Sequence, residues 1–316
     1  MARVAGIDCG TNSIRLLVAD VDDAGTLTEI DRRMEVVRLG QGVDRTGRIA
    51  PEALERTLAA VREYAAICAE LGAERIRFVA TSASRDAENR AEFVDGVRAA
   101  IGVEPEVVGG EEEARLSFRG ATSVLAGRHP GPFLVVDIGG GSTELVLGAT
   151  SVVAAASMDV GSVRLTERHL HDDPPTPEQV AAASRDVVAA LDAAARVVPL
   201  GRAATLVGLA GSVTSVTAHA LDLDTYDRRA IDGSLLPVDT VLRSCGELAT
   251  MSRAKRARLP FLHPGRVDVI GAGALIWSDV VSRVRAEVGA AGGRLRHVVT
   301  SEHDLLDGIA LSAAGH

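Results

Sequence analysis

The chain alternates between short continuous apolar runs and longer segments in which apolar residues recur every three or four positions. Apolar runs at Val4–Ile7, Ile14–Val21 and Arg75–Ala80 predict strands. Pro51 opens a segment whose apolar residues follow helical spacing, and Gly72 ends it. This alternation of strands and helices predicts an α/β protein.

The same pattern extends along the whole chain. It predicts further strands at 28–38, 104–108, 133–138, 143–147, 152–157, 206–209 and 296–300. It predicts further helices at 88–101, from about 111, and at 162–169, 177–197, 212–221, 237–250, 265–288 and 304–313. The length of 316 residues favours two domains, and the Pro/Gly-rich segment Ala126–Pro132 is the candidate boundary. We expect a first domain of residues 1–125, joined by a C-terminal helix at about 301–316, and a second of residues 126–300.

One motif occurs twice. The sequence GIDCGTNSIRLLV begins at Gly6, and VDIGGGSTELVL begins at Val136. A gap-free alignment matches Asp8 with Asp137, and the small polar turns and apolar strands around them also align. An apolar strand, Asp-x-Gly, a small polar turn and a second apolar strand therefore occur in both halves. This repeat predicts two related lobes that face one central cleft.

Composition and charge narrow the classes of function. Apolar residues make up 47% and aromatic residues 3% of the chain, so Ala, Val, Leu and Ile must build the cores. The formal net charge of −9 argues against a nucleic-acid or membrane-surface binder. The cysteines Cys9, Cys68 and Cys245 are widely spaced, which is typical of free thiols in the cytoplasm. Asp8 interrupts the first apolar run, and glycines interrupt the longest one, so neither a signal peptide nor a membrane span is expected.

Three turns rich in small residues are candidates for phosphate binding. Turns built from Gly, Ser, Thr and Asn expose backbone N–H groups that can bind phosphate oxygens. The candidates are Thr11, Asn12 and Ser13 in the first turn, Gly139, Gly140, Gly141, Ser142 and Thr143 in the second, and Gly208, Gly211 and Ser212 in the third. The third precedes a predicted helix, whose N-terminus favours anions. One such turn alone is typical of a hairpin, but two related turns that both follow an Asp favour phosphate binding.

Several carboxylates lie beside these turns. Asp8 and Asp137 each end a strand before a turn, and the predicted hairpin brings Glu144 back to Asp137. Carboxylates with substrate oxygens and water suit a hard cation such as Mg²⁺, although each Asp could instead brace its turn. In Gly109–Arg115, acids in the first helical turn ordinarily stabilise the helix dipole. That interpretation is preferred for Glu111 and Glu112, whereas Glu113 remains open on local grounds.

Eight blocks together resemble a known family. They are GIDCGTNSIRLLV, FVATSASRDAENR (78–90), GGEEEARLSFRGA (109–121), LVVDIGGGSTELVLG (134–148), MDVGSVRLTE (158–167), VGLAGSVTSVTA (207–218), RVDVIGAGALI (266–276) and SEHDLLDGIAL (301–311). In this order they resemble the signature blocks of the exopolyphosphatase/guanosine pentaphosphate phosphatase (Ppx/GppA) family and cover nearly the whole chain. The sequence departs at Thr11, where the family more often has serine, and the hydroxyl is retained.

The resemblance implies a fold, an activity and roles for residues. The fold is two actin-like (ribonuclease H-like) domains of the ASKHA superfamily around a central cleft. The activity is removal of the terminal phosphoryl group of inorganic polyphosphate or of guanosine pentaphosphate (pppGpp). The resemblance implies that Glu113 acts on the attacking water, that Asp137 and Glu144 serve the metal and catalysis, and that Arg85 faces the phosphate chain. The metal is Mg²⁺ or another divalent cation such as Mn²⁺, and a homodimer is expected from the family alone.

Arginines could supply further contacts to a polyanion. Those within or beside the blocks are Arg15, Arg85, Arg115, Arg119 and Arg164. The run Arg253–Arg258 is interpreted as a solvated helix face, and the alternative is a rim that captures distal phosphates. Because the chain ends soon after the last block, where longer members continue, we expect a preference for short polyphosphate.

Other functions fit parts of this pattern. One alternative is a pppGpp 5′-phosphohydrolase. Its substrate presents the same type of bond to the same turns as polyphosphate does, so the sequence does not separate this enzyme from an exopolyphosphatase. A sugar or acid kinase of the same superfamily is disfavoured by the GEEEAR block. A non-catalytic sensor of polyphosphate or (p)ppGpp is disfavoured because Glu113, Asp137 and Glu144 are all present.

Overall fold

The computed structural model describes residues 1–315, which form two compact units. The first comprises Met1–Gly120 and the chain from Leu305 onward, and the second comprises Ala121–Asp304. The division falls within the helix α5 (Gly110–Leu125), before the Pro/Gly-rich segment. The helix continues past Gly120 because the next strong helix breakers in the sequence are Gly127 and Pro130.

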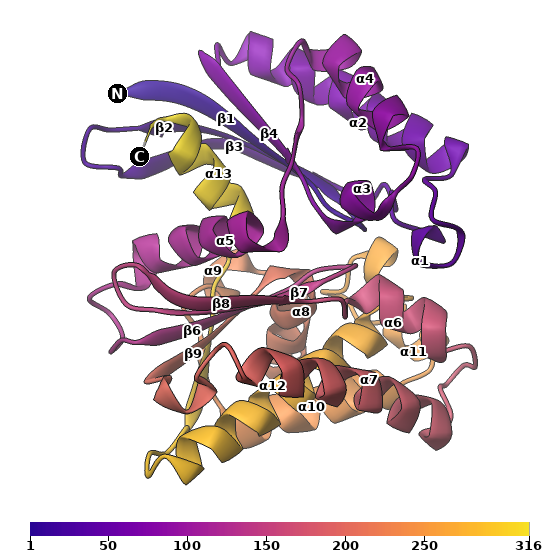
Figure 1. Cartoon of the computed structure of the whole chain (residues 1–316), viewed down its shortest axis with the longest axis vertical. Coiled ribbons are helices and arrows are strands. Elements are labelled where there is room, and N and C mark those ends of the chain that lie inside the picture. The colour runs from indigo at the N-terminus through magenta and orange to yellow at the C-terminus, as the bar shows by residue number, and fades with distance from the viewer. Residues whose placement is uncertain (316) are drawn as a thin grey trace. The chain divides into compact units, whose positions relative to one another are not determined.

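The first unit is built on a five-stranded sheet. Its strands are β1 (Ala2–Cys9), β2 (Ile14–Val21), β3 (Leu27–Glu35), β4 (Arg75–Ala80) and β5 (Glu106–Val107), in the order β3-β2-β1-β4-β5. Strands β1, β2 and β3 are antiparallel neighbours, whereas β4 and β5 run parallel to β1. Its helices are α1 (Val43–Thr46), α2 (Pro51–Glu70), α3 (Ser82–Asp86), α4 (Arg90–Ile101), α5 and α13 (Leu305–Ala313), drawn in Figure 1.

Both faces of this sheet are covered by helices. Successive side chains of a strand point to opposite faces, and apolar residues occupy both sets of positions. On β1, Ala5 and Ile7 belong to a buried cluster with residues of α2 and α4, which lie side by side in Figure 1. Val4 faces the other way and packs with Leu306 and Ala310 of α13. Gly6 allows this approach, since a Cβ there would lie 3.0 Å from the backbone nitrogen of Ala310.

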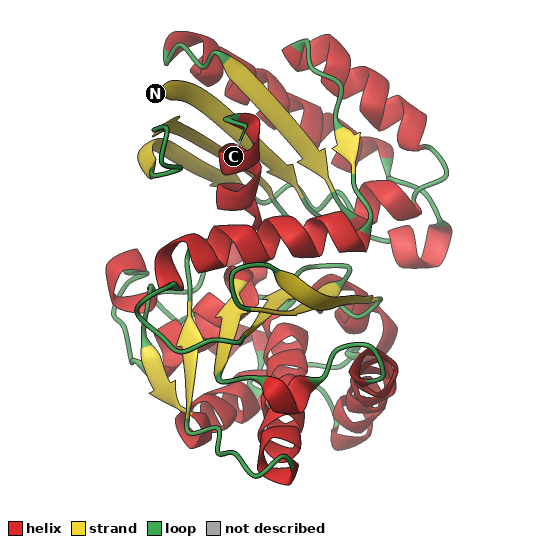
Figure 2. Cartoon of the chain, turned by 60° about the vertical axis from the view of Figure 1, so that its left-hand side comes forward, coloured by secondary structure: helices red, strands yellow, loops and turns green. Residues whose placement is uncertain are grey.

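The second unit contains a six-stranded sheet. Its strands are β6 (Phe133–Ile138), β7 (Thr143–Gly148), β8 (Val152–Met158), β9 (Thr205–Leu209), β10 (Leu235–Pro237) and β11 (His297–Thr300), in the order β10-β11-β9-β6-β7-β8. Its helices are α6 (Ser162–His169), α7 (Pro177–Ala195), α8 (Ala210–Ala220), α9 (Arg228–Ile231), α10 (Val238–Thr250), α11 (Arg253–Arg256) and α12 (Ile270–Ala290), with 3₁₀ turns at Leu200–Arg202 and Pro264–Arg266. Figure 2 shows the strands of each unit gathered into one sheet with helices beside it.

The two sheets repeat one topology. Strands β6, β7 and β8 are antiparallel neighbours, and β9 and β11 run parallel to β6, as β4 and β5 do to β1. Strand β10 is an addition at the edge of the second sheet. This shared order confirms the internal repeat and the predicted fold class, an α/β protein made of two ribonuclease H-like, actin-like domains.

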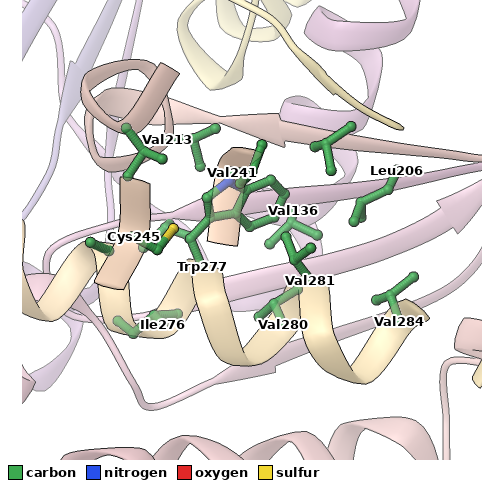
Figure 3. Close-up of a cluster of buried hydrophobic side chains, with 14 of the residues drawn as sticks. Val136, Leu206, Val213, Val241, Cys245, Ile276, Trp277, Val280, Val281 and Val284 are labelled. Atoms are coloured by element: carbon green, nitrogen blue, oxygen red, sulfur yellow. The ribbon is translucent and has the colours of Figure 1, made fainter. Parts of the chain in front are cut away.

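The core of the second unit centres on Trp277 of α12. The side chain is 1% exposed and lies among aliphatic residues of the sheet and of neighbouring helices (Figure 3). Gly208 of β9 makes room for it, because a Cβ there would stand 2.7 Å from the indole ring. Trp277 therefore serves the packing of α12 against the sheet.

Most predicted elements are present, with differences at their ends and in short segments. The helix predicted at 265–288 begins only at Ile270, because Pro264 starts a separate 3₁₀ turn. Short elements such as α1, α3 and α9 were not predicted, since four or five residues are too few to display a helical period. No helix within residues 1–315 has the length and apolar character needed to cross a membrane.

Candidate active site

The first predicted phosphate turn joins β1 to β2. Gly10 donates its N–H to the carbonyl of Ser13 (3.0 Å) and closes a tight turn. The N–H groups of loop residues 38 and 40 donate to the carbonyls of Asn12 and Thr11 (2.8 Å each). The carbonyl side of the turn is thus occupied, whereas the N–H groups of Thr11, Asn12 and Ser13 have no acceptor within residues 1–315.

The second turn, between β6 and β7, has the same geometry. Gly139 donates its N–H to the carbonyl of Ser142, again at 3.0 Å. The start of α6 occupies the other carbonyls: backbone N–H groups bind those of Gly139 and Gly140, and Nε of Arg164 binds that of Gly141 (2.7 Å). In the described part of the chain, the N–H groups of Gly140, Gly141 and Ser142 have no acceptor.

These two turns are suited to bind oxyanions. A run of N–H groups directed away from their own chain forms a concave donor set of the kind that binds phosphate. The first turn adds a side-chain donor, because Nδ2 of Asn12 is buried and has no partner among residues 1–315. Gly161 keeps the second turn close to α6, since a Cβ there would stand 2.4 Å from the carbonyl oxygen of Gly140.

The two repeats differ in the residue opposite the shared Asp. In the first unit Asp8 pairs across the strands with Arg15, whose Nη2 and Nε lie 2.6 and 2.9 Å from Oδ2. In the second unit Asp137 pairs with Glu144 at the same register. The first pair is an ion pair, whereas the second places two carboxylates opposite each other across the strands.

The Asp137–Glu144 pair is a candidate cation site. Asp137 is 6% and Glu144 1% exposed, and like charges directly opposite each other across strands repel. Oε1 of Glu144 accepts a hydrogen bond from Ser157 (2.8 Å), which orients that carboxylate. A buried pair of carboxylates fits Mg²⁺, which takes one or two carboxylates and completes its shell with water and substrate oxygens.

The predicted metal ligands do not all lie in one unit. Asp8 belongs to the first unit, and its carboxylate is held by Arg15; Asp137 and Glu144 belong to the second. No group of three or more His, Cys, Asp or Glu side chains within residues 1–315 is arranged to hold a metal. The buried pair in the second unit is therefore the best candidate for a metal site.

In the first unit, α3 and α5 place two more predicted residues near the turn. Oγ1 of Thr11 hydrogen-bonds Oγ of Ser82 (2.8 Å) at the start of α3, which also carries Arg85. Nη1 of Arg85 lies 2.9 Å from the carbonyl oxygen of Val108 and 3.4 Å from Oε2 of Glu113. Arg85 thus connects the α3 side of the turn to the start of α5.

The three consecutive acids of α5 have different environments. Glu111 pairs with Arg115 one turn later (2.7 Å) on the surface, and the half-buried Glu112 pairs with Arg77 (3.4 Å). Glu113 is 6% exposed and contacts Arg85. The structure separates a buried carboxylate that contacts Arg85 from two more exposed acids, a distinction that the local sequence left open.

The third turn leads from β9 into α8. Ala210 begins the helix with a φ of 65°, the left-handed region, so the chain turns sharply after the strand. Ser212 packs against α12, where Gly273 has no side chain to obstruct its hydroxyl. Arg266 lies over Gly211: a Cβ on that glycine would come within 1.8 Å of the guanidinium carbon.

The sequence reasoning missed some of these residues. Arg266 stands in the RVDVIGAGALI block, but was not singled out as a contact to the third turn. Tyr226 was also missed; its hydroxyl contacts Glu302 and lies 2.9 Å from Oγ1 of Thr214 on α8. Burial raises the pKa of Tyr226, with the nearby Glu302 adding to the effect, so this hydroxyl stays protonated. The signal for Arg266 was its place within a signature block.

Parallel strands explain why the candidate residues gather within each unit. Cys9, Ala80 and Val107 are in register at the ends of β1, β4 and β5, so the segments that follow these strands leave from one edge. In the second unit the ends of β6, β9 and β11 meet in the same way. In open α/β sheets, ligands bind outside the carboxyl ends of the strands.

Cys9 adjoins the first turn but does not serve as a nucleophile. Its side chain is 1% exposed, and burial, aided by the charge of Asp8, raises the pKa of the thiol. The reactive form of cysteine is the thiolate, which this environment disfavours. Chemistry at this turn must therefore use other groups.

Comparison with known proteins identifies the family. The profile of the Ppx/GppA phosphatase family matches residues 17–302. The chain belongs to this family. The Ppx/GppA resemblance predicted from the eight blocks is thereby confirmed.

One similar Ppx/GppA relative is exopolyphosphatase 2 of Mycobacterium tuberculosis. It is 50% identical over 323 aligned positions, which cover 100% of this chain and 99% of the relative. Exopolyphosphatase 1 of the same species is 36% identical over 57% of this chain and 52% of its own length.

Solved structures of the family share the whole fold. An exopolyphosphatase-like protein is 50% identical with a TM-score of 0.96, and the match covers 98% of this chain and 97% of that one. The Ppx/GppA family member of Aquifex aeolicus is 29% identical with a TM-score of 0.78, over 99% and 97% of the two chains.

Proposed function

We propose that this protein is an exopolyphosphatase, which hydrolyses the terminal phosphoryl group of inorganic polyphosphate. The main support is its 50% identity over the full chain to a mycobacterial exopolyphosphatase. The two phosphate turns and the buried acids Glu113, Asp137 and Glu144 are compatible with this activity. The free, buried cysteines suit a reducing compartment, and we place the reaction in the cytoplasm.

Substrate binding falls to the N–H groups of the turns. We propose that Thr11, Asn12 and Ser13 bind phosphate oxygens in the first unit, and that Gly139–Thr143 and the third turn (Gly208, Gly211, Ser212) do so in the second. Backbone donors fixed in place stabilise the charge that spreads over phosphoryl oxygens in the transition state. Arg85 adds a positive charge beside Glu113.

Glu113 is the proposed group that acts on water. Its carboxylate is buried, and Arg85 orients it through one contact of 3.4 Å. A positioned carboxylate can orient a water molecule for in-line attack and accept its proton. The leaving group is the shortened polyphosphate, which departs with the bridging oxygen.

Asp137 and Glu144 are the residues that would hold Mg²⁺ or Mn²⁺. The bound cation would neutralise charge on the phosphoryl oxygens. Asp8 was also predicted as a ligand, and Arg15 as a phosphate contact. Because these two residues form an ion pair, we propose instead that Arg15 holds Asp8 at the end of β1.

The second candidate is hydrolysis of pppGpp at the same residues. The family profile covers phosphatases of both kinds, and both substrates end in a phosphoanhydride. The test is phosphate release from tripolyphosphate, long polyphosphate and pppGpp, side by side with Mg²⁺. Turnover of polyphosphate well above that of pppGpp would support the proposal, and the reverse would favour the second candidate. No release from any of the three would contradict both and favour a sensor.

A further inference from the structure

One arginine of the basic run 253–258 is buried. The run was interpreted as a solvated helix face, and Arg253, Lys255 and Arg258 are indeed exposed. Arg256, the last residue of α11, is only 6% exposed, so for this residue the interpretation was wrong. The short helix turns one of its cations inward.

The Arg256 guanidinium has no partner in the described part of the chain. Its Nε is buried without a hydrogen bond, and residues 1–315 supply neither a hydrogen bond nor an ion pair to its other nitrogens. The two nearby carboxylates serve Arg253: Asp268 lies 2.8 Å from its Nε, and Asp173 accepts its backbone N–H (2.6 Å). Burial lowers the pKa of Arg256, with Asp173 and Asp268 opposing that effect. A buried cation without a direct counter-charge is costly.

Arg256 lies against the first turn of α12, a helix of 21 residues. A Cβ on Gly271 would stand 2.6 Å from Nη1 of Arg256 and 3.6 Å from the carbonyl oxygen of Ala249 at the end of α10. The N–H groups of Ile270, Gly271 and Ala272 have no acceptor within residues 1–315. A helix N-terminus carries partial positive charge, so an arginine beside it adds to an unfavourable concentration of positive charge.

An anion would satisfy both groups at once. We propose that Arg256 and the first turn of α12 form a binding site for a phosphate group. The guanidinium would donate charge-assisted hydrogen bonds, and the helix N–H groups would complete the donor set. Gly271 is the residue that permits this arrangement, because any side chain there would displace the guanidinium.

The site is close to the phosphate turns of its own unit. Two residues after Gly271, Gly273 contacts Ser212 of the third turn and lies 3.5 Å, measured from its Cβ position, from Cβ of Ser162. Ser162 in turn donates its N–H to Gly139 of the second turn. The first turn of α12 thus lies beside the two turns of the second unit that are proposed to bind the reacting phosphate.

Two sources could supply this phosphate. One is a phosphate unit of a polyphosphate chain that does not itself react. The other is free orthophosphate, which the proposed reaction releases. Only the choice between these sources rests on the proposed function, because binding of an oxyanion can be measured without turnover.

The first experiment uses the wild-type protein. Crystals soaked in tungstate, a phosphate mimic with strong scattering, are expected to show an ion within hydrogen-bond distance of Arg256 and of the α12 N–H groups. Calorimetric titration with orthophosphate is expected to show one binding event more than binding at the turns accounts for. Tungstate at the turns but not at Arg256 would overturn the proposal, and would do so whether or not the enzyme hydrolyses polyphosphate.

The second experiment compares Arg256→Gln with Arg258→Gln, which removes an exposed charge of the same run. Arg256→Gln is expected to weaken the additional orthophosphate binding by about tenfold or more, the effect of losing a charged hydrogen bond. Arg258→Gln is expected to leave it unchanged. Equal behaviour of the two variants would contradict the site. If Arg256→Gln fails to fold, Gly271→Ala, which displaces the guanidinium but keeps its charge, replaces it.

Kinetics then separate the sources. If the site takes a distal phosphate unit, Arg256→Gln raises KM for long polyphosphate but not for tripolyphosphate. If it takes free orthophosphate, the variant weakens product inhibition and leaves both KM values unchanged. If tungstate binds in the crystal but Arg256→Gln changes neither the KM values nor product inhibition, then neither source uses the site during turnover. The proposed role is then refuted.

Discussion

The residue opposite the repeated Asp distinguishes the two units. Arg15 neutralises Asp8 in the first, whereas Glu144 doubles the negative charge beside Asp137 in the second. One substitution within a repeated hairpin thus changes an ion pair into a candidate cation site. The consequences of this difference can be tested residue by residue.

Glu113→Gln is expected to lower kcat by ~10²-fold or more, because glutamine cannot accept a proton from water. The fold should be unaffected, since the substitution preserves shape. Glu111→Gln, which changes a surface acid of the same helix, is the control and should keep full activity. Steady-state kinetics with thermal denaturation decide the matter, and near-normal turnover in Glu113→Gln would remove this residue from catalysis.

Asp137→Asn is expected to lower the rate and to raise the Mg²⁺ concentration needed for half-maximal activity. The reason is that the pair with Glu144 loses one of its two negative charges. Asp159→Asn, at an exposed site in the same unit, should change neither quantity. Full activity of the wild-type enzyme in excess chelator would contradict a metal-assisted reaction.

At the scale of elements, glycines determine how closely helices approach their neighbours. Gly308 of α13 lies so near α5 that a Cβ would stand 2.0 Å from the carbonyl oxygen of Leu116. Gly246 of α10 is exposed and has no heavy atom within 4 Å of the same position. The same substitution should therefore have opposite effects at the two sites.

Gly308→Ala is expected to destabilise the protein by about 1–3 kcal/mol, because the helix must shift away from Leu116. Gly246→Ala should instead stabilise it by about 0.5–1 kcal/mol, since alanine loses less backbone freedom on folding. Chemical denaturation of both variants measures these changes. No loss of stability in Gly308→Ala would show that the packing of α13 against α5 is described wrongly, and a loss in Gly246→Ala would show the same for the exposed face of α10.

At the scale of the whole molecule, net charge opposes a long polyanion. The chain carries a formal charge of −9, so phosphate units that extend beyond the local cationic groups meet an acidic surface. Attraction must come from the N–H turns and from arginines such as Arg85 and Arg256. We therefore expect binding to be concentrated on few phosphate units.

Catalytic efficiency is expected to level off or fall as polyphosphate lengthens, with release of products of intermediate length. Each additional unit gains little attraction once the cationic groups are filled. Kinetics on length-sorted polyphosphates, with products resolved by electrophoresis, measure this. A continuous rise in efficiency with no intermediates would instead indicate an extended cationic track.

Sequence alone determined the fold class, the repeat, the three turns and most strands and helices. These features depend on residues close together in the chain, so periodicity and turn chemistry specify them. The eight blocks also indicated the family before any contact was known. The roles given to the turns and to Glu113, Asp137 and Glu144 remain predictions.

Tertiary structure decided which of the charged residues have partners. Arg266 contacts Gly211, which lies far from it in the sequence. Arg256 is buried against Gly271, which belongs to a different helix. In the sequence Arg256 looks like its neighbours Arg253 and Arg258, because the run carries no signal of which cation faces inward. Only the packing of α11 against α12 fixes that choice, since burial depends on the shape of the surface that a short helix meets.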